Sequence, residues 1–213
     1  TVLVGAGTMI LTYIAGVVVL GPLGDLVGGI VVKFFLWASA TFGPVAIALL
    51  ASAMPWLVMT GMHHAVTPFM VQAFADPGYD VFFRPSYILH NMAEGGACLG
   101  VALRTKNPEF RAECLSLAFG CIVAGVTEPA LYGVNLPLKR PMLGIMAGTA
   151  VGGIIAGVLG ATAYVYGYST ILALPIFQQT MWAMAIAIVA AIVVSALVTA
   201  SLGFEDRPVK AQK

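Results

Sequence analysis

Charged residues are scarce in this sequence. Only 9% of its 213 residues are Asp, Glu, Lys or Arg, whereas soluble domains usually carry about 25%. None of the four occurs from Phe34 to Met62 or from Pro141 to Phe204. Because a helix needs about 20 apolar residues to cross a bilayer, the second stretch can hold two spans and a turn. The scarcity excludes a water-soluble globule and predicts an all-α integral membrane protein, a polytopic helical bundle.

Other features are also missing, and each absence excludes a class of protein. The net charge is only +1, so no basic surface is available for a nucleic-acid partner. The three cysteines, Cys98, Cys114 and Cys121, have no Cys-x-x-Cys spacing, which argues against a disulfide framework or a metal site. HExxH, Walker A, GxSxG and Rossmann glycine patterns are absent too. We therefore expect neither a metal nor a cofactor.

The beginning of the chain is apolar and has no basic segment or small-residue cleavage site before it, so no signal peptide is predicted. We expect the chain to be a fragment of a longer protein, with Val2–Leu20 as a span. The shorter stretch Leu26–Trp37 holds a lysine and is expected to lie as a helix at the membrane interface. Residues 1–38 then form one unit, 39–204 a transport domain and 205–213 a polar cytoplasmic tail.

Proline and glycine indicate where the remaining apolar segments bend or end. Phe42–Thr60 contains two prolines, so we expect a bent or broken helix there. Ser86–Leu103 could form another membrane segment, although polar residues interrupt its apolar character. Met142–Tyr166 and Thr180–Leu202 are predicted to be long spans, since both are apolar and lie in the long uncharged stretch.

The positions of the basic residues predict which segments share a membrane face. Lysine and arginine in short loops mark the cytoplasmic side. They gather around Arg104, at Lys139-Arg140 and in the tail after Glu205. All three groups are therefore expected on the cytoplasmic side. The chain between Arg104 and Lys139 must then enter and leave the membrane by the same face, as a re-entrant hairpin.

The two ends of the first arm of this hairpin have recognisable sequence signals. Asn107-Pro108-Glu109 combines an N-cap amide, a proline at the first helical position and an acid in the first turn. Gly125 and Pro129 predict that the helix stops near Ala124, with extended or turned backbone at Glu128. A helix of about 17 residues carries the chain roughly 25 Å inward.

Glu128 lies near the predicted turn of the hairpin. An ionisable residue inside a membrane costs about 2.5–3.5 kcal/mol and is functional by default. Non-helical backbone at that depth is tolerated only inside protein or beside a water-filled cavity. We expect Glu128 to face a substrate chamber and to accept hydrogen bonds from substrate hydroxyl groups, with Thr127 adding a hydroxyl. The alternative is that Glu128 is a structural acid and that Thr127 bonds to its own backbone.

Polar residues in two other segments complete the candidate site. Neighbours on a helix point about 100° apart, so one of His63 and His64 can face the chamber while the other packs or caps; both could also be structural. His90 and Glu94 would share a helix face, where they could simply shield each other from lipid. We include Asn91 and Glu94 as substrate-binding candidates. The segment around the two histidines, like the hairpin turn, is an apolar helix broken by glycine and followed by a polar residue and proline, as in many transporter sites.

The stretch Gly125–Pro141 reads GVTEPALYGVNLPLKRP and resembles the GITEP signature of sugar permeases of the phosphotransferase system. It is similar to the membrane (EIIC) domain of the glucose superfamily, and most similar to the β-glucoside branch. Gly61–His64 resembles a second family segment, Gly-Leu-His. Val126 replaces the usual Ile and Met62 the usual Leu. The resemblance covers about Leu3 to Asp206, the later part of the family's membrane domain.

This resemblance implies a function and a site. It implies a permease of the bacterial inner membrane that moves a β-glucoside, or a related disaccharide such as sucrose or trehalose, inward while a phosphocysteine on a partner IIB domain phosphorylates it. Phosphoenolpyruvate is the ultimate donor. By the same analogy Glu128 is the catalytic residue beside the accepting hydroxyl, His63 is the second sugar contact, and His64 is the less favoured of the pair.

The resemblance also implies partners. The family's dimer-forming first spans would be largely missing, so a homodimer through that half is expected. No cysteine lies in a soluble polar loop, so the phosphoryl donor must be elsewhere in the protein or on another chain, and this chain is the membrane component of a sugar phosphotransferase. The rival hypothesis is an ion-coupled secondary sugar transporter, in which Glu128 binds a proton or Na⁺.

Overall fold

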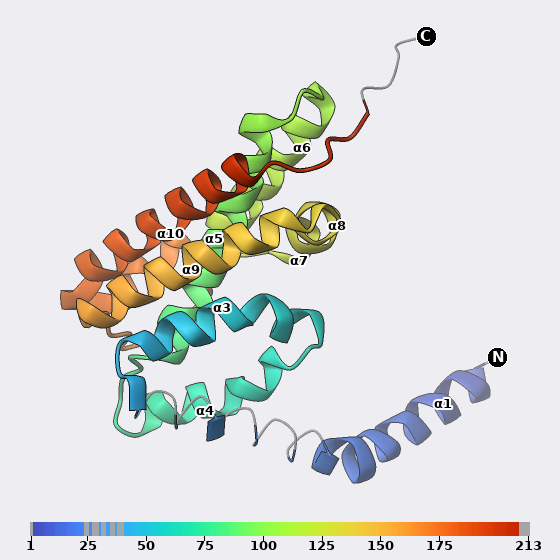
Figure 1. Cartoon of the computed structure of the whole chain (residues 1–213). Coiled ribbons are helices and arrows are strands. Elements are labelled where there is room, and N and C mark those ends of the chain that lie inside the picture. Colours follow the sequence, from blue (N-terminus) through green and yellow to red (C-terminus); the bar gives the residue numbers. More distant parts are fainter. Residues whose placement is uncertain are drawn as a thin grey trace.

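The computed structural model describes residues 2–23, 26, 30, 33, 34, 37 and 41–208, and their regular structure is helical (Figure 1). In chain order the helices are α1 (Val2–Ala15), η1 (Gly16–Leu20), α3 (Val45–Met59), α4 (His63–Ala75), α5 (Phe83–Arg104), α6 (Pro108–Phe119), η2 (Gly120–Ala124), α7 (Glu128–Ala130), η3 (Leu131–Asn135), α8 (Leu136–Leu138), α9 (Arg140–Val158), η4 (Ile171–Thr180) and α10 (Met181–Leu202). Among these, η1, η2 and η3 are π-helical turns and η4 is a 3₁₀ segment.

The helices agree with the predicted fold class. Three stretches of the described residues, Ala6–Leu23, Arg140–Val158 and Ile171–Leu202, are long and apolar enough to cross a membrane. The all-α membrane fold is therefore confirmed. The break expected in Phe42–Thr60 falls at its start, where a turn at residues 43 and 44 precedes α3. The interfacial helix predicted over Leu26–Trp37 lies mostly outside the described residues.

Glycine allows the central helices to pack closely. The helix α9 packs against α3, α5 and α10, and α5 also packs against α10 (Figure 1). A Cβ atom at Gly96 of α5 would lie 2.5 Å from a backbone oxygen of α10, and one at Gly148 of α9 would lie 2.5 Å from the oxygen of Ala191. A Cβ at Gly153 would lie 2.5 Å from the Cα of Ala48 in α3. These small residues let the backbones approach, as is common between membrane helices.

The first of the two long C-terminal spans is shorter than predicted. We predicted helix from Met142 to Tyr166, but α9 ends at Val158. Gly160 has a φ of +69°, a left-handed conformation that suits glycine and commonly ends helices. The chain then runs irregularly to Thr170, whose hydroxyl accepts a hydrogen bond from Leu172 N at 3.0 Å and so caps η4. Apolar composition therefore overestimated the length of the helix.

The first arm of the hairpin begins and ends as its sequence predicts. The Asn107 side-chain oxygen accepts hydrogen bonds from the backbone N–H groups of Glu109 at 3.0 Å and Phe110 at 3.2 Å, as an N-cap does. The arm continues through α6 and η2 and stops at Gly125, whose φ is +75°. The second arm, formed by α7, η3 and α8, leads back to Lys139.

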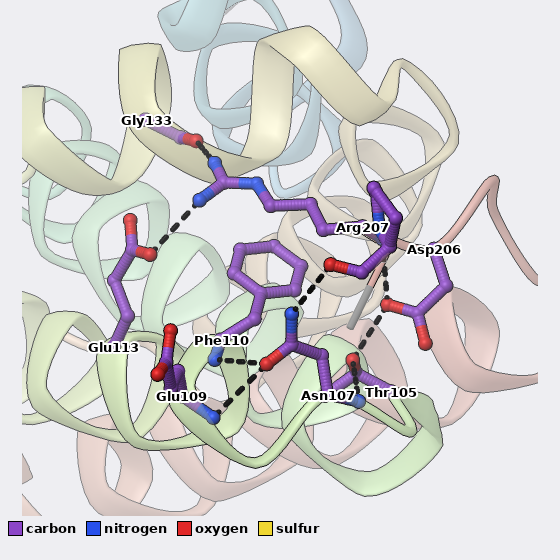
Figure 2. A network of polar contacts seen from close by, with 9 residues as sticks. Thr105, Asn107, Glu109, Phe110, Glu113, Gly133, Asp206 and Arg207 are labelled. Carbon is purple, nitrogen blue, oxygen red and sulfur yellow. Dashed lines mark hydrogen bonds and ion pairs between the residues drawn. The ribbon is translucent and has the colours of Figure 1, made fainter. Parts of the chain in front are cut away.

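The predicted basic groups lie together at one end of the bundle. Arg104 and Arg140 each donate a hydrogen bond of 2.6 Å to a carbonyl oxygen in the last turn of α10. Figure 2 shows the tail folded against the base of the hairpin, where Arg207 pairs with Glu113 at 2.9 Å and donates to the Gly133 oxygen at 2.6 Å. The hairpin thus starts and finishes at the same end, as the charge pattern predicted.

Candidate functional site

Two helices are broken at a left-handed glycine, and each break is followed closely by a polar residue. Between α3 and α4 the break is at Gly61, with φ +74°, and His63 begins the next helix. Between η2 and α7 it is at Gly125, with φ +75°, and Glu128 begins the next helix. A side chain with a Cβ is disfavoured in this conformation. The two segments, which are alike in sequence, therefore also share a left-handed glycine at the break.

The polar residues that follow both breaks line one cavity of about 390 Å³, a size that suits a small organic ligand. Its wall mixes aromatic, methionine and polar side chains. The polar and ionisable ones are His63, His64, Thr67, Arg84, Tyr87, His90, Asn91, Thr127, Glu128, Tyr166, Tyr168 and Ser169. Of the candidate site residues predicted from the sequence, all except Glu94 line this cavity.

Glu128 is exposed on the cavity wall, whereas the neighbouring Thr127 is buried. The prediction of extended or turned backbone at Glu128 was wrong, because this residue is the first of the short helix α7. Pro129 is then in the first turn of that helix, where a missing backbone N–H leaves no hydrogen bond unmade. The helix start directs the carboxylate into the cavity.

His63 and His64 both line the cavity, so neither of them is turned away to pack or cap, which their helical spacing would have allowed. Their rings lie against each other with centroids 3.9 Å apart. They occupy the first turn of α4, and the Tyr87 hydroxyl of α5 donates a hydrogen bond to the His63 carbonyl oxygen. This contact positions the start of α4 against α5, and the two rings, tilted by 39° to each other, both line the cavity.

Asn91 holds two loops in place. Its side-chain nitrogen donates hydrogen bonds to the Ser169 oxygen at 2.8 Å and to the Gly125 oxygen at 3.3 Å. Because Asn91 precedes Arg104 by 13 residues on α5, the hairpin turn lies about 20 Å from the basic end of the bundle. This agrees with the predicted depth of the hairpin.

His90 and Glu94 of α5 are packed away from solvent. Glu94 is 0% exposed and does not line the cavity. It lies 3.5 Å from His90, which is 1% exposed. The structure therefore does not place Glu94 in direct contact with a ligand in this cavity. A contact between His90 and Glu94 was the alternative predicted from their spacing. It forms because residues four positions apart lie one helix turn from each other.

Sequence reasoning overlooked part of the wall. Arg84 is the only lysine or arginine between Lys33 and Arg104, and an ionisable residue in a membrane segment is itself a signal of function. Tyr166 and Ser169 gave no such signal, since they lie in the irregular segment after α9 that was predicted to be partly helical. Only the folding of this segment back onto α5 brings them to the cavity.

The comparison with protein families matches residues 3–149 to the model described as "Phosphotransferase system, EIIC". The matched part contains both broken helices and most of the cavity wall, and it amounts to more than half of the chain. The chain belongs to the phosphotransferase-system EIIC family. The resemblance found in the motifs around Gly61 and Gly125 is thereby confirmed.

Curated proteins similar to this EIIC chain are sugar-specific components of the phosphotransferase system. The chain is 34% identical over 200 residues to the arbutin-, cellobiose-, and salicin-specific EIIBC component of Escherichia coli (strain K12), covering 91% of this chain and 41% of the relative. It is 35% identical over 190 residues to the beta-glucoside-specific EIIBCA component of Bacillus subtilis (strain 168), covering 88% of this chain and 31% of the relative. It is 29% identical over 203 residues to the trehalose-specific EIIBC component of Escherichia coli (strain K12), covering 92% of this chain and 42% of the relative.

The EIIC chain spans less than half the length of these relatives. No solved structure matches it. The family match and the apolar helices establish the family, the all-helical membrane fold and the multi-pass character of this chain. The activity of the whole protein is a matter for proposal.

Proposed function

We propose that this EIIC chain is the later part of a sugar permease of the phosphotransferase system, which binds a glycoside in the cavity between the two broken helices. The observation that carries the proposal is that His63 and Glu128, from segments far apart in the sequence, line one cavity. The names of the relatives favour a β-glucoside, with sucrose and trehalose as neighbouring possibilities. The domain limits at residues 38 and 204 remain predictions.

Glu128 would carry the chemistry of the site. Its carboxylate can accept hydrogen bonds from two sugar hydroxyl groups, and such charge-assisted bonds are stronger than neutral ones. In the transfer step a sugar hydroxyl oxygen would form the new P–O bond while the P–S bond to the donor cysteine breaks. Glu128 would orient that hydroxyl and accept its proton. The donor thiolate leaves, so charge and atoms balance.

The other polar residues would support this chemistry. His63 and His64 offer imidazole nitrogens beside the carboxylate, and Thr127 offers a hydroxyl on the same wall. Asn91 is proposed as a positioning residue, because its amide hydrogen bonds already go to the backbone of two loops. Glu94 would act only indirectly, through its contact with His90.

The proposed partners follow from the relatives, which are named as EIIBC or EIIBCA components. We propose a phosphorylated IIB domain, on the same or another polypeptide, as the donor. It would approach from the cytoplasmic side of the bacterial inner membrane, where the basic end of the bundle would lie. A homodimer through the preceding membrane half is part of the proposal.

Transport by whole cells tests the proposed function. Radiolabelled salicin should appear inside as salicin phosphate, and only when phosphoenolpyruvate and the general phosphotransferase proteins are present. Cells lacking the general proteins are the control. Accumulation of free sugar that collapses when the proton or Na⁺ gradient is removed would reject the proposal in favour of ion-coupled transport.

The sidedness of the bundle gives a separate prediction. Lys106→Cys and Lys139→Cys should both react with a membrane-impermeant maleimide only from the cytoplasmic side, because their segments meet at one end of the bundle. Tyr79→Cys, in the loop before α5, should react only from the opposite side, since α5 is about 33 Å long. The native cysteines are buried, and labelling of the protein without introduced cysteines gives the background. Labelling of the two lysine positions from opposite faces would contradict the hairpin.

A further inference from the structure

Arg84 is a buried cation on the wall of the sugar cavity, and the hydrogen bonds that it makes are few. Its side chain is 3% exposed. One terminal nitrogen donates to the Met70 sulfur at 3.6 Å and the other to the Ser169 hydroxyl, while its Nε has no hydrogen-bond partner. A buried charge is costly unless it is paired and hydrogen-bonded. Within the part of the chain that the structure describes, this guanidinium therefore lacks an ion-pair partner and an acceptor for its Nε.

Asp80 attracts Arg84 electrostatically, but the two side chains do not form an ion pair. Asp80 accepts hydrogen bonds of 2.6 to 2.9 Å from three backbone N–H groups at the start of α5, the last being that of Arg84. Within the described residues the ion pairs are His90–Glu94 and Arg207–Glu113. Arg84 is in neither. It also lies in the first turn of α5, where the helix dipole is positive and further disfavours a cation.

Two aromatic rings hold the guanidinium in place. Its central carbon lies 5.7 Å from the ring centroid of Tyr87 and 5.4 Å from that of Tyr166. Cation–π attraction at such distances stabilises the guanidinium, but it does not neutralise the charge. The rings restrict the side chain, and Tyr166 also interacts with it through its side chain, while Nε keeps a free donor. A donor held in place in this way favours the binding of an anionic ligand.

The loop that contains Ser169 links Arg84 to the hairpin turn. Ser169 accepts a hydrogen bond from Arg84 through its hydroxyl and one from Asn91 through its backbone oxygen, and Asn91 also donates to the Gly125 oxygen. Arg84 and Glu128 thus line one cavity with opposite charges. A ligand that satisfied both would present hydroxyl donors to Glu128 and an anionic group to Arg84.

We propose that the substrate of this EIIC chain is a glycoside bearing a carboxylate, and that Arg84 binds that carboxylate. The planar guanidinium fork suits two parallel hydrogen bonds to a carboxylate, and it would supply the buried cation with its counter-charge. The inference rests on the proposed function, since it names the substrate class of the same cavity. It makes Arg84 a residue that determines specificity.

A matched pair of glucosides tests the inference. Salicin carries a hydroxymethyl group on its phenyl ring, and 2-carboxyphenyl β-D-glucopyranoside carries a carboxylate at the same position. Binding to the full protein in nanodiscs would be measured by calorimetry. We expect the carboxylate compound to bind at least about tenfold more tightly than salicin. Arg84→Gln should abolish this difference, by weakening the binding of the carboxylate compound at least about tenfold more than that of salicin.

Two further variants separate charge from folding. Arg84→Lys should keep part of the preference, because it retains the charge but not the fork. Arg111→Gln should keep all of it, because Arg111 donates to the Thr105 oxygen and is not on the wall of this cavity. Equal affinity of the wild type for the two glucosides would overturn the inference, as would an equal loss of both in Arg84→Gln.

The outcomes distinguish this inference from the proposed function. If salicin is bound and phosphorylated but the carboxylate compound is not preferred, the permease function stands and the inference fails. If a monodisperse, folded protein binds neither glucoside, both fail. Tighter binding of the carboxylate compound that depends on Arg84 supports both.

Discussion

Glu128→Gln is expected to lower phosphoenolpyruvate-dependent sugar phosphorylation by about 100-fold or more, with no loss of protein from the membrane. Each hydrogen bond to a charged group is worth about 1.5–3 kcal/mol, and about 1.4 kcal/mol corresponds to a factor of ten. Glutamine keeps the size of the side chain but removes the charge and the proton acceptor. The exposed position of Glu128 on the cavity wall means that the fold should tolerate the change. Phosphorylation by membrane vesicles and immunoblotting of the membrane fraction measure the two effects.

Glu109→Gln is the matched control. It makes the same chemical change at an exposed acid in the first turn of α6, outside the cavity, and should leave phosphorylation within about twofold of wild type, because exposed charges contribute little. Normal phosphorylation by Glu128→Gln would refute the assigned role. A loss of both variants from the membrane would point to a structural role for the two acids.

Gly148→Ala should destabilise the bundle by about 2 kcal/mol or more. The added Cβ would lie 2.5 Å from the Ala191 oxygen, 2.7 Å from the Ser195 Cβ and 3.0 Å from the Ser195 nitrogen. Two of these are backbone atoms of α10, which cannot rotate away, so α9 and α10 must separate. Overpacking of this kind typically costs about 1–3 kcal/mol. The midpoint of thermal unfolding in detergent should fall, together with the yield of monodisperse protein.

Gly133→Ala gives the opposite expectation and serves as the control. Nothing lies within 4 Å of a Cβ at Gly133, and alanine is favoured over glycine in a helix by about 1 kcal/mol. The substitution should therefore leave the midpoint unchanged or raise it. Equal midpoints for Gly148→Ala and wild type would show that the α9–α10 contact is looser than the structure describes.

Local signals predicted much of the hairpin. Asn107 has an amide that can cap a helix, and Gly125 can take the left-handed conformation, so both ends of the first arm follow from nearby residues. The charge of Arg104 and Arg140 places their segments at one end because burying such groups in lipid is costly. These inferences depend on interactions within a few residues or on the membrane itself, and both act before any tertiary contact forms.

The remaining part of the site depends on contacts between distant segments. Ser169 meets Arg84 across 85 positions of the sequence and Asn91 across 78, and no local pattern encodes either contact. The end of α9 at Val158 was missed because the residues beyond it are as apolar as those within it. Whether Glu94 faces the cavity or the protein interior likewise depends on how α5 is rotated against its neighbours.

The sequence by itself determined that this protein is a helical membrane protein of the EIIC family, because scarce charge, helix-breaking glycines and the GVTEP segment are all local properties. It also singled out Glu128, since one acid between a glycine and a proline is visible without a fold. The tertiary structure alone decided that both histidines line the cavity, that Glu94 does not, and that Arg84 is buried with no ion-pair partner among the described residues. Those facts depend on packing, because packing decides which residues that are far apart along the chain come close together in space.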